Sequence, residues 1–239
     1  METQAHQEGR LSARPRAPGS PPPPPGLHAL DLGTPPRGAL LYVPLGYLPE
    51  RPAPLTLMLH GAGGSGAGVL APLRTWADEA GLLVLAPDSL GPTWDLVRED
   101  FGADVARLDV ALAQVFSRCA VDPERLACAG FSDGASYALS LGLTNGDLFT
   151  HVLAFSPGFM APGAAHGRPL IYVSHGTQDR VLPLEKCSRR LVPRLRAAGH
   201  EVQYVEFEGP HTVPPERGRE ALALLLEGGP RPAAGQAGS

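Results

Sequence analysis

The chain has 239 residues, of which 43% are hydrophobic and 18% are charged. This composition predicts a globular core and excludes a wholly disordered polymer, a coiled coil and collagen. Its 20 lysines and arginines against 24 aspartates and glutamates give a net charge of −4 without a dense basic run, which argues against nucleic acid as a partner.

The two ends differ in composition from the rest of the chain. A proline run at Pro21–Pro25 favours polyproline II and donates no backbone hydrogen bonds. We therefore expect a disordered, Pro-rich arm over residues 1–26, a folded domain over 27–227 and a disordered tail rich in glycine and alanine over 228–239. No apolar stretch reaches the roughly 18 residues of a membrane helix, and no secretory signal is visible, so we expect a cytoplasmic protein without a membrane span.

Short apolar runs alternate with longer amphipathic ones through the folded domain. We predict strands at Ala39–Val43, Leu55–His60, Leu82–Ala86, Leu126–Gly130, His151–Phe155, Pro169–Ser174 and Glu201–Phe207. We predict helices at about 67–80, 101–118, 133–144, 184–199 and 214–226. This alternation favours an α/β fold with a mostly parallel sheet covered by helices on both faces. In such folds the functional residues gather on loops at the carboxyl ends of the strands.

A glycine-rich loop, Gly61–Gly66, follows the predicted strand that ends at His60. Its letters match the G-x-G-x-x-G of dinucleotide-binding folds, and Asp88 lies about where those folds place a ribose-binding acid. Glycine-rich turns between a strand and a helix also expose backbone N–H groups to other anions. The loop by itself leaves both functions open.

A second glycine motif, Gly130-Phe131-Ser132-Asp133-Gly134, matches G-x-S-x-G between a predicted strand and a predicted helix. The two glycines allow a sharp turn that exposes the Ser132 hydroxyl at the carboxyl rim of the sheet. A serine hydroxyl alone is a weak nucleophile, so a catalytic function requires a base and an acid nearby. Without them, the motif is a glycine-flanked helix N-cap.

The base and the acid are sought after the serine, because this motif is followed along the chain by an acid and then a histidine. His211 follows the last predicted strand and so lies at the same rim as Ser132. Asp179 directly follows the strand Pro169–Ser174, whereas Asp147 follows a helix and is expected at the opposite rim. We therefore predict Ser132 as nucleophile, His211 as general base and Asp179 as the acid that orients it.

Attack of a serine on an ester creates an oxyanion that needs about two preorganised N–H donors, an oxyanion hole. The residue after the nucleophile and an early strand–helix loop usually supply them. We assign the donors to Asp133 and Ala62, with Gly63 as the fallback for the second. This assignment gives the loop Gly61–Gly66 a role without a nucleotide.

Four blocks of sequence carry a family resemblance: Leu59–Gly64, Gly130–Gly134, His175–Asp179 and Gly209–Thr212. Together they resemble the α/β-hydrolase superfamily and, within it, the phospholipase/carboxylesterase group that includes acyl-protein thioesterases. The resemblance implies an α/β-hydrolase fold and a serine esterase that uses neither a metal nor an organic cofactor. It also implies a catalytic triad of Ser132, Asp179 and His211.

The substrate is predicted from the rim loops. The segment 157–168 is too short for an elaborate helical lid, so we expect minimal or no lid and an open site for a small-molecule ester with a short acyl or an aryl group. Trp94 and Met160 lie on rim loops and are candidates for the pocket wall, with ordinary loop packing as the alternative. An acyl thioesterase, a feruloyl-type phenolic-ester hydrolase and a non-catalytic binding protein stay open as alternatives, as do a monomer and a homodimer.

Overall fold

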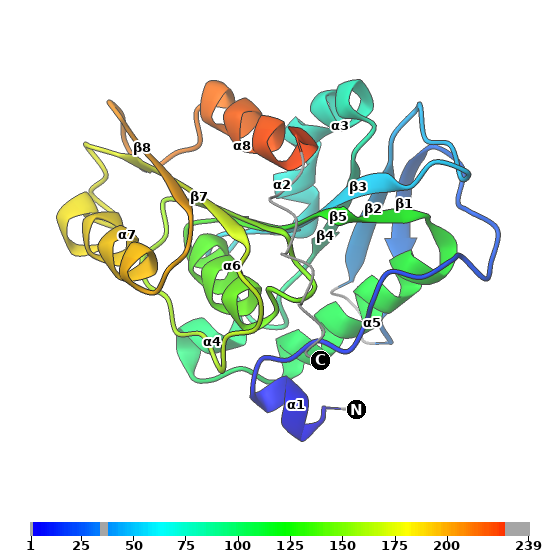
Figure 1. Cartoon of the computed structure of the whole chain (residues 1–239), viewed down its shortest axis with the longest axis horizontal. Helices are drawn as coiled ribbons and strands as arrows, with labels where there is room; N and C mark the ends of the chain where they lie inside the picture. Colours follow the sequence, from blue (N-terminus) through cyan, green and yellow to red (C-terminus); the bar gives the residue numbers. More distant parts are fainter. Residues whose placement is uncertain (1, 34–37, 228–239) are drawn as a thin grey trace, which may run out of the picture.

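The computed structural model describes residues 2–33 and 38–227. Within these residues an eight-stranded sheet has the order β1-β2-β4-β3-β5-β6-β7-β8 (Figure 1). Its strands are β1 Gly26–Leu30, β2 Ala39–Val43, β3 Ala53–Leu59, β4 Leu83–Pro87, β5 Val121–Phe131, β6 His151–Phe155, β7 Leu170–Gly176 and β8 Val202–Phe207. β2 pairs antiparallel with β1 and β4, and the remaining neighbours pair parallel, which confirms the mostly parallel sheet.

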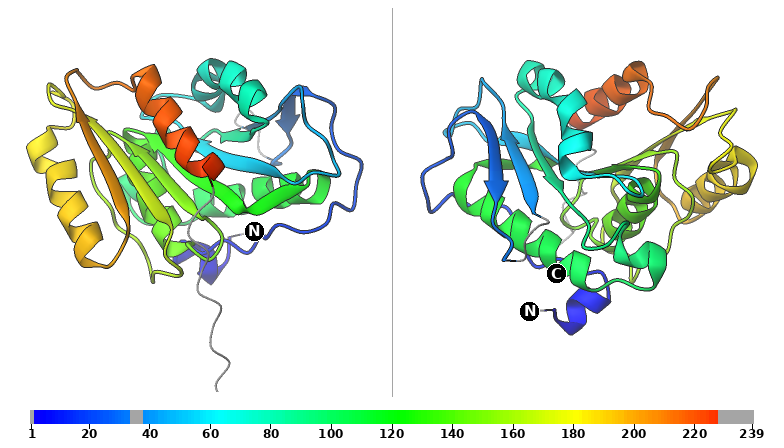
Figure 2. Two further views of the ribbon diagram at one scale, coloured as in Figure 1. Left: turned by 45° about the horizontal axis from the view of Figure 1, so that its top comes forward. Right: turned by 180° about the vertical axis from the view of Figure 1, so that it is seen from behind.

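Helices cover both faces of the sheet (Figures 1 and 2). The described helices are α1 Gln4–Gln7, α2 Gly66–Leu70, α3 Arg74–Ala80, α4 Asp95–Arg98, α5 Ala103–Arg118, α6 Asp133–Thr144, α7 Ser188–Ala197 and α8 Pro215–Glu227. Buried side chains of α5, α6 and α7 pack on one face, and those of α2, α3 and α8 pack on the other. The chain thus has the three-layer α/β architecture that the sequence predicts.

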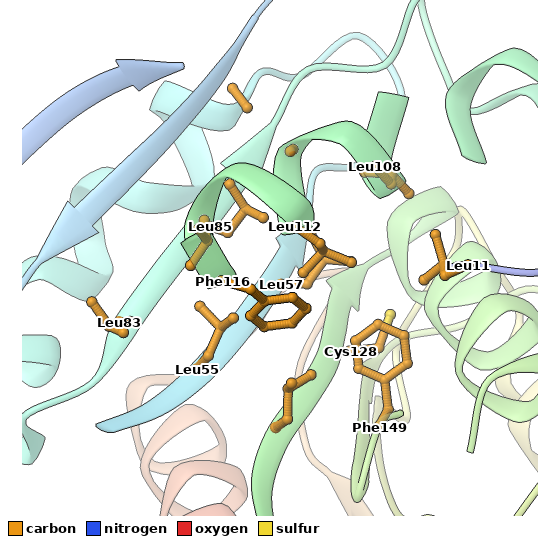
Figure 3. Packing of buried hydrophobic residues seen from close by; sticks show 14 of the residues in the cluster. Leu11, Leu55, Leu57, Leu83, Leu85, Leu108, Leu112, Phe116, Cys128 and Phe149 are labelled. Atoms are coloured by element: carbon orange, nitrogen blue, oxygen red, sulfur yellow. The ribbon is translucent and has the colours of Figure 1, made fainter. Parts of the chain in front are cut away.

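The central strand β3 shows why the sheet is apolar on both faces. Leu55, Leu57 and Leu59 belong to the cluster that packs against α5, whereas Met58 belongs to the cluster under α3 and α8. Figure 3 shows Leu55 and Leu57 among the aromatic and leucine side chains of the first cluster. Because successive side chains of a strand point to opposite faces, a strand between two helical layers is a continuous apolar run.

Several elements differ from the sequence prediction, among them the short helices α1 and α4, which were not predicted. β1 was not predicted, and it forms because Gly26–Leu30 pairs antiparallel with β2 at the edge of the sheet, where only its last residue is buried. The helix expected at 67–80 is divided into α2 and α3 by a 3-10 turn at Ala71–Leu73. Pro72 lies in that turn, and because it has no backbone N–H it interrupts the α-helical hydrogen bonds.

The expectation of a disordered arm over residues 1–26 is wrong for the part that the structure describes. Leu11 is 2% exposed and lies in the cluster under α5 (Figure 3). Arg10 and Arg14 both bind the Asp147 carboxylate, at 2.8 and 2.7 Å. The buried leucine and the shared ion pair offset the entropy of ordering the segment, which a count of prolines does not reveal.

Three other expectations concern the ends and the lid. The described segment 157–168 carries no helix, in agreement with a minimal lid. Residues 228–239, expected to form a disordered tail, lie outside the described residues. None of the helices within residues 2–33 and 38–227 has the length and apolar character needed to cross a bilayer.

Candidate active site

Ser132 lies in the turn between β5 and α6 with a positive φ of 58°, a conformation that is strained for a residue with a side chain. The flanking glycines are required by close backbone contacts. A Cβ on Gly130 would lie 2.2 Å from the Gly134 carbonyl oxygen, and a Cβ on Gly134 would lie 2.3 Å from the Leu59 carbonyl oxygen. The turn therefore brings Ser132 to the carboxyl rim of the sheet and to the N-terminus of α6.

Three predicted residues form one hydrogen-bonded chain at this rim. His211 Nε2 lies 2.9 Å from Ser132 Oγ, and His211 Nδ1 lies 2.5 Å from Asp179 Oδ2. The three follow β5, β7 and β8, so the parallel strands bring together groups that are far apart in sequence. Since the Asp179 carboxylate accepts the Nδ1 proton, Nε2 is left free to accept the proton of Ser132.

The Asp179 carboxylate is buried, with a side-chain exposure of 0%. The pKa of this carboxyl group lies below its usual value. Burial alone raises the pKa, but this effect is outweighed by the hydrogen bond from the Leu182 N–H, by the His211 ring and by the hydrogen bond from the Val181 N–H. The two backbone donors lie 2.8 and 2.9 Å from Oδ1. The carboxylate therefore stays ionised at neutral pH and holds the His211 ring in one orientation.

The two predicted oxyanion donors lie next to Ser132. Among the described residues, the backbone N–H groups of Ala62 and Asp133 have no protein acceptor. The neighbouring Gly61 is so close to Ser132 that a Cβ on the glycine would lie 3.2 Å from the serine Cβ. The fallback donor, Gly63, already donates its N–H to the Pro92 carbonyl at 2.7 Å. The geometry therefore favours Ala62 over Gly63.

Comparisons with known proteins agree with this fold and rim. Feruloyl esterase C of Emericella nidulans is 29% identical over 157 residues, which is 62% of this chain and 57% of that protein. The crystal structure of esterase PE8 is 25% identical with a TM-score of 0.61 and matches 74% of this chain and 96% of that one. The chain therefore has the α/β-hydrolase fold and is similar to serine esterases of that fold.

Two further comparisons limit how far this likeness extends. The CE1 ferulic acid esterase AmCE1/Fae1A of Anaeromyces mucronatus matches 91% of this chain with a TM-score of 0.64, but at 18% identity it shows the fold alone. No family model matches the chain. The chain also spans less than two thirds of the length of the curated feruloyl esterases that it matches.

A second histidine contacts Asp179. His175 Nε2 lies 2.8 Å from the Leu182 carbonyl and 3.2 Å from Asp179 Oδ2, while Nδ1 lies 2.7 Å from Ser188 Oγ. Because a carbonyl only accepts, Nε2 carries the proton, and burial lowers the pKa of His175 and keeps the ring neutral. The sequence predicted no role for His175, although this residue begins the same block, His175–Asp179, as the proposed acid.

Asp88, the acid considered for a ribose, is engaged by the protein itself. Its Oδ1 accepts the Gly66 N–H at 2.8 Å, and its Oδ2 accepts the Gly38 N–H at 3.3 Å. The carboxylate thus secures the end of the glycine-rich loop. This contact removes the feature that favoured a dinucleotide site in the sequence.

The two candidates for the pocket wall have different positions. Trp94 is fully buried, donates its indole N–H to the His60 carbonyl at 2.8 Å and packs between the rings of His60 and Tyr137. The prediction that it lines an open pocket is therefore wrong, because its ring is enclosed in the core. Met160 is half-buried against the cluster between α6 and α7, and its role in a pocket stays a prediction.

An apolar cavity of about 450 Å³ lies between α2, α3 and α8, above β3 to β6. Phe131 and Val213 form part of its wall, and the Phe131 ring lies 4.7 Å from the His211 ring. The cavity therefore adjoins the hydrogen-bonded chain through Phe131. Sequence reasoning missed this residue, although its position directly before Ser132 places it at the rim.

Proposed function

We propose that this chain is a carboxylesterase that hydrolyses its substrate through an acyl-enzyme on Ser132. The observation that carries the proposal is the hydrogen-bonded chain of Ser132, His211 and Asp179 beside two backbone N–H groups that have no acceptor within the described part of the chain. This combination supplies a nucleophile, a base, an orienting carboxylate and oxyanion donors.

In the first half of the reaction, Ser132 Oγ attacks the ester carbonyl carbon while His211 Nε2 takes the hydroxyl proton. The N–H groups of Ala62 and Asp133 donate to the oxygen that becomes negative, and Asp179 stabilises the imidazolium. When the carbonyl re-forms, the bond to the alcohol breaks and His211 gives the proton to the departing oxygen. In the second half, water attacks the acyl-enzyme with the same proton transfers.

For the substrate we propose a short-chain acyl ester or an aryl ester. The proposal rests on the segment 157–168, which carries no helix that could form an elaborate lid. A chain-length series of p-nitrophenyl esters tests it. The highest kcat/KM is expected for short acyl groups, and a maximum beyond about twelve carbons contradicts it.

A feruloyl-type hydrolase is the second candidate. It is supported by the names of the curated relatives and by the apolar cavity of about 450 Å³, a volume within the range that accommodates ring-containing ligands. Methyl ferulate compared with p-nitrophenyl butyrate separates the two functions, since only a feruloyl-type enzyme prefers the first. An acyl thioester in the same assay covers the thioesterase alternative.

Ser132→Ala tests the mechanism. We expect ester hydrolysis to fall to background while the thermal unfolding temperature stays close to that of the wild type, since the hydroxyl is removed without leaving a large cavity. A fluorophosphonate probe followed by intact-mass analysis is expected to add one adduct to the wild type and none to the variant. Undiminished hydrolysis by the variant refutes the mechanism, and absence of an adduct on the wild type favours a binding protein on a hydrolase scaffold.

We also propose a cytoplasmic location. The proposal rests on the three cysteines, Cys119, Cys128 and Cys187, which are buried free thiols as expected in a reducing compartment. Cell fractionation followed by immunodetection of the chain tests it, and recovery outside the cytoplasmic fraction contradicts it.

A further inference from the structure

Three consecutive residues between β4 and α4 connect the two loops that carry the proposed oxyanion donors. The Pro92 carbonyl accepts the Gly63 N–H at 2.7 Å, next to Ala62. Thr93 Oγ1 donates to Asp133 Oδ2 at 2.7 Å. The third residue, Trp94, donates its indole N–H to the carbonyl of His60, which precedes the glycine-rich loop. The segment Pro92–Trp94 therefore touches the loop after β3 and the first turn of α6.

This segment is itself held firmly. The Asp104 carboxylate accepts the backbone N–H groups of Leu90 and Asp95 at 2.8 and 2.9 Å. The Asp95 carboxylate accepts the hydroxyl proton of Tyr137 in α6 at 2.9 Å. With the Trp94 ring fully buried between these contacts, the segment has little freedom to move. A rigid segment can fix the spacing of the loops to which it is bonded.

The spacing of the donors matters because they come from different strands. The Ala62 N–H belongs to the loop after β3, and the Asp133 N–H belongs to the turn after β5, so no single helix sets their separation. Oxyanion stabilisation requires both donors within about 2.7–3.1 Å of one oxygen. A bridge between the loops, such as Pro92–Trp94, is therefore suited to keep the two donors aimed at the same point.

The segment Pro92–Trp94 also orients the negatively charged side chain of Asp133. Its carboxylate is attached to the residue whose backbone N–H is proposed to bind the oxyanion, and a negative charge there opposes the negative charge that forms during attack. The Thr93 hydroxyl donates to this carboxylate and holds it at the bridge. A hydrogen bond from a fixed donor both orients the carboxylate and disperses its charge.

We propose that Thr93 is a positioning residue of the oxyanion site, which acts by holding the Asp133 side chain at the bridge Pro92–Trp94. The inference rests on the proposed esterase function and adds a specific role to a residue outside the hydrogen-bonded chain of Ser132, His211 and Asp179. Thr93 acts on the transition state, where the oxyanion exists, rather than on substrate binding.

Thr93→Val removes the donor with little change in shape. We expect kcat for p-nitrophenyl butyrate to fall about tenfold with KM changed less than twofold, because an interaction realised only in the transition state affects kcat. Thr93→Ser, which keeps a hydroxyl, is expected to recover most of the lost kcat. The matched control is Thr75→Val, at an exposed threonine of α3 that does not line the apolar cavity, which is expected to leave both constants unchanged.

A double-mutant cycle with Asp133→Asn separates positioning from general stability. When Thr93→Val is combined with Asp133→Asn, the loss that it causes is expected to shrink to within about threefold, since a neutral amide no longer opposes the oxyanion. Three results overturn the inference. The first is a loss of kcat from Thr93→Val that is equal with and without Asp133→Asn, and the second is a kcat for Thr93→Val within twofold of the wild type. The third is failure of Thr93→Ser to recover activity. Fluorophosphonate labelling of the wild type is measured first: a labelled enzyme with any of these results refutes only the role of Thr93, whereas an unlabelled wild type refutes the proposed function as well.

Discussion

Asp179→Asn is the substitution whose effect the geometry specifies most closely. Oδ1 of the carboxylate accepts two backbone N–H groups, from Val181 and Leu182, at 2.9 and 2.8 Å. The asparagine carbonyl oxygen must take this place, because an NH₂ group there would face two donors. Its NH₂ group then takes the place of Oδ2, opposite His211 Nδ1.

The orientation of the new amide determines the state of the histidine. An NH₂ group can only donate, so Nδ1 must become the acceptor and the proton of the neutral imidazole moves to Nε2. Nε2 then presents an N–H to Ser132 Oγ and cannot take its proton. The NH₂ group also faces the Nε2–H of His175, which lies 3.2 Å from Oδ2 in the wild type.

The wrong tautomer is expected to lower kcat by about 10³–10⁴-fold, which is about 4–5.5 kcal/mol of transition-state stabilisation. The assay is steady-state hydrolysis of p-nitrophenyl butyrate at neutral pH, with circular dichroism and thermal unfolding to show that the fold is intact. A folded Asp179→Asn enzyme that retains more than a tenth of the wild-type kcat refutes the assignment of Asp179 as the orienting acid.

Two other predictions test the turn and the N-terminal segment. Gly134→Ala is expected to abolish activity or soluble expression, because its Cβ would lie 2.3 Å from the Leu59 carbonyl oxygen. The control is Gly46→Ala, whose Cβ would meet no atom within 4 Å. Activity of Gly134→Ala at the level of this control contradicts the close contact. The hydrogen bond from Arg10 holds the pKa of Asp147 below its usual 3.8. The ionised Asp147 therefore stabilises the folded state fully above pH 3.8, and this stabilisation is lost as the pH falls toward the lowered pKa. Urea unfolding should therefore show that Asp147→Asn lowers the free energy of unfolding by about 1 kcal/mol at pH 7, a small value because the ion pair is partly exposed. This loss is expected to be smaller at pH 3. A loss that becomes larger in acid contradicts the sign.

Much of the candidate site is predictable because its residues sit in short motifs with strict backbone requirements. Gly130 and Gly134 are required because any Cβ there meets a carbonyl oxygen, and this requirement gives the G-x-S-x-G spacing. Asp179 and His211 are predictable for a related reason, since each directly follows an apolar run that becomes a strand of the parallel sheet. Adjacent parallel strands end at one rim, so the order of the runs along the chain already brings these groups together.

Contacts across the fold are not predictable in this way. Leu11 and Asn145 are 134 positions apart, and their hydrogen bond shows that the N-terminal segment lies against the domain instead of extending into solvent. The burial of Trp94 depends likewise on His60 and Tyr137, which flank its ring from other elements. A rim position in the sequence does not distinguish a side chain that turns inward from one that lines a pocket.

The sequence by itself predicted the proposed nucleophile, base and acid and the alternation of elements that places them on one rim, because each prediction depends on local spacing and strand order. The tertiary structure decided which backbone donors remain for an oxyanion, since Pro92 occupies the Gly63 N–H and leaves that of Ala62. It also decided that Thr93 meets Asp133, 40 positions away. Such choices depend on how separate loops pack against each other, and packing distances are set by the whole fold rather than by the residues on either side in the chain.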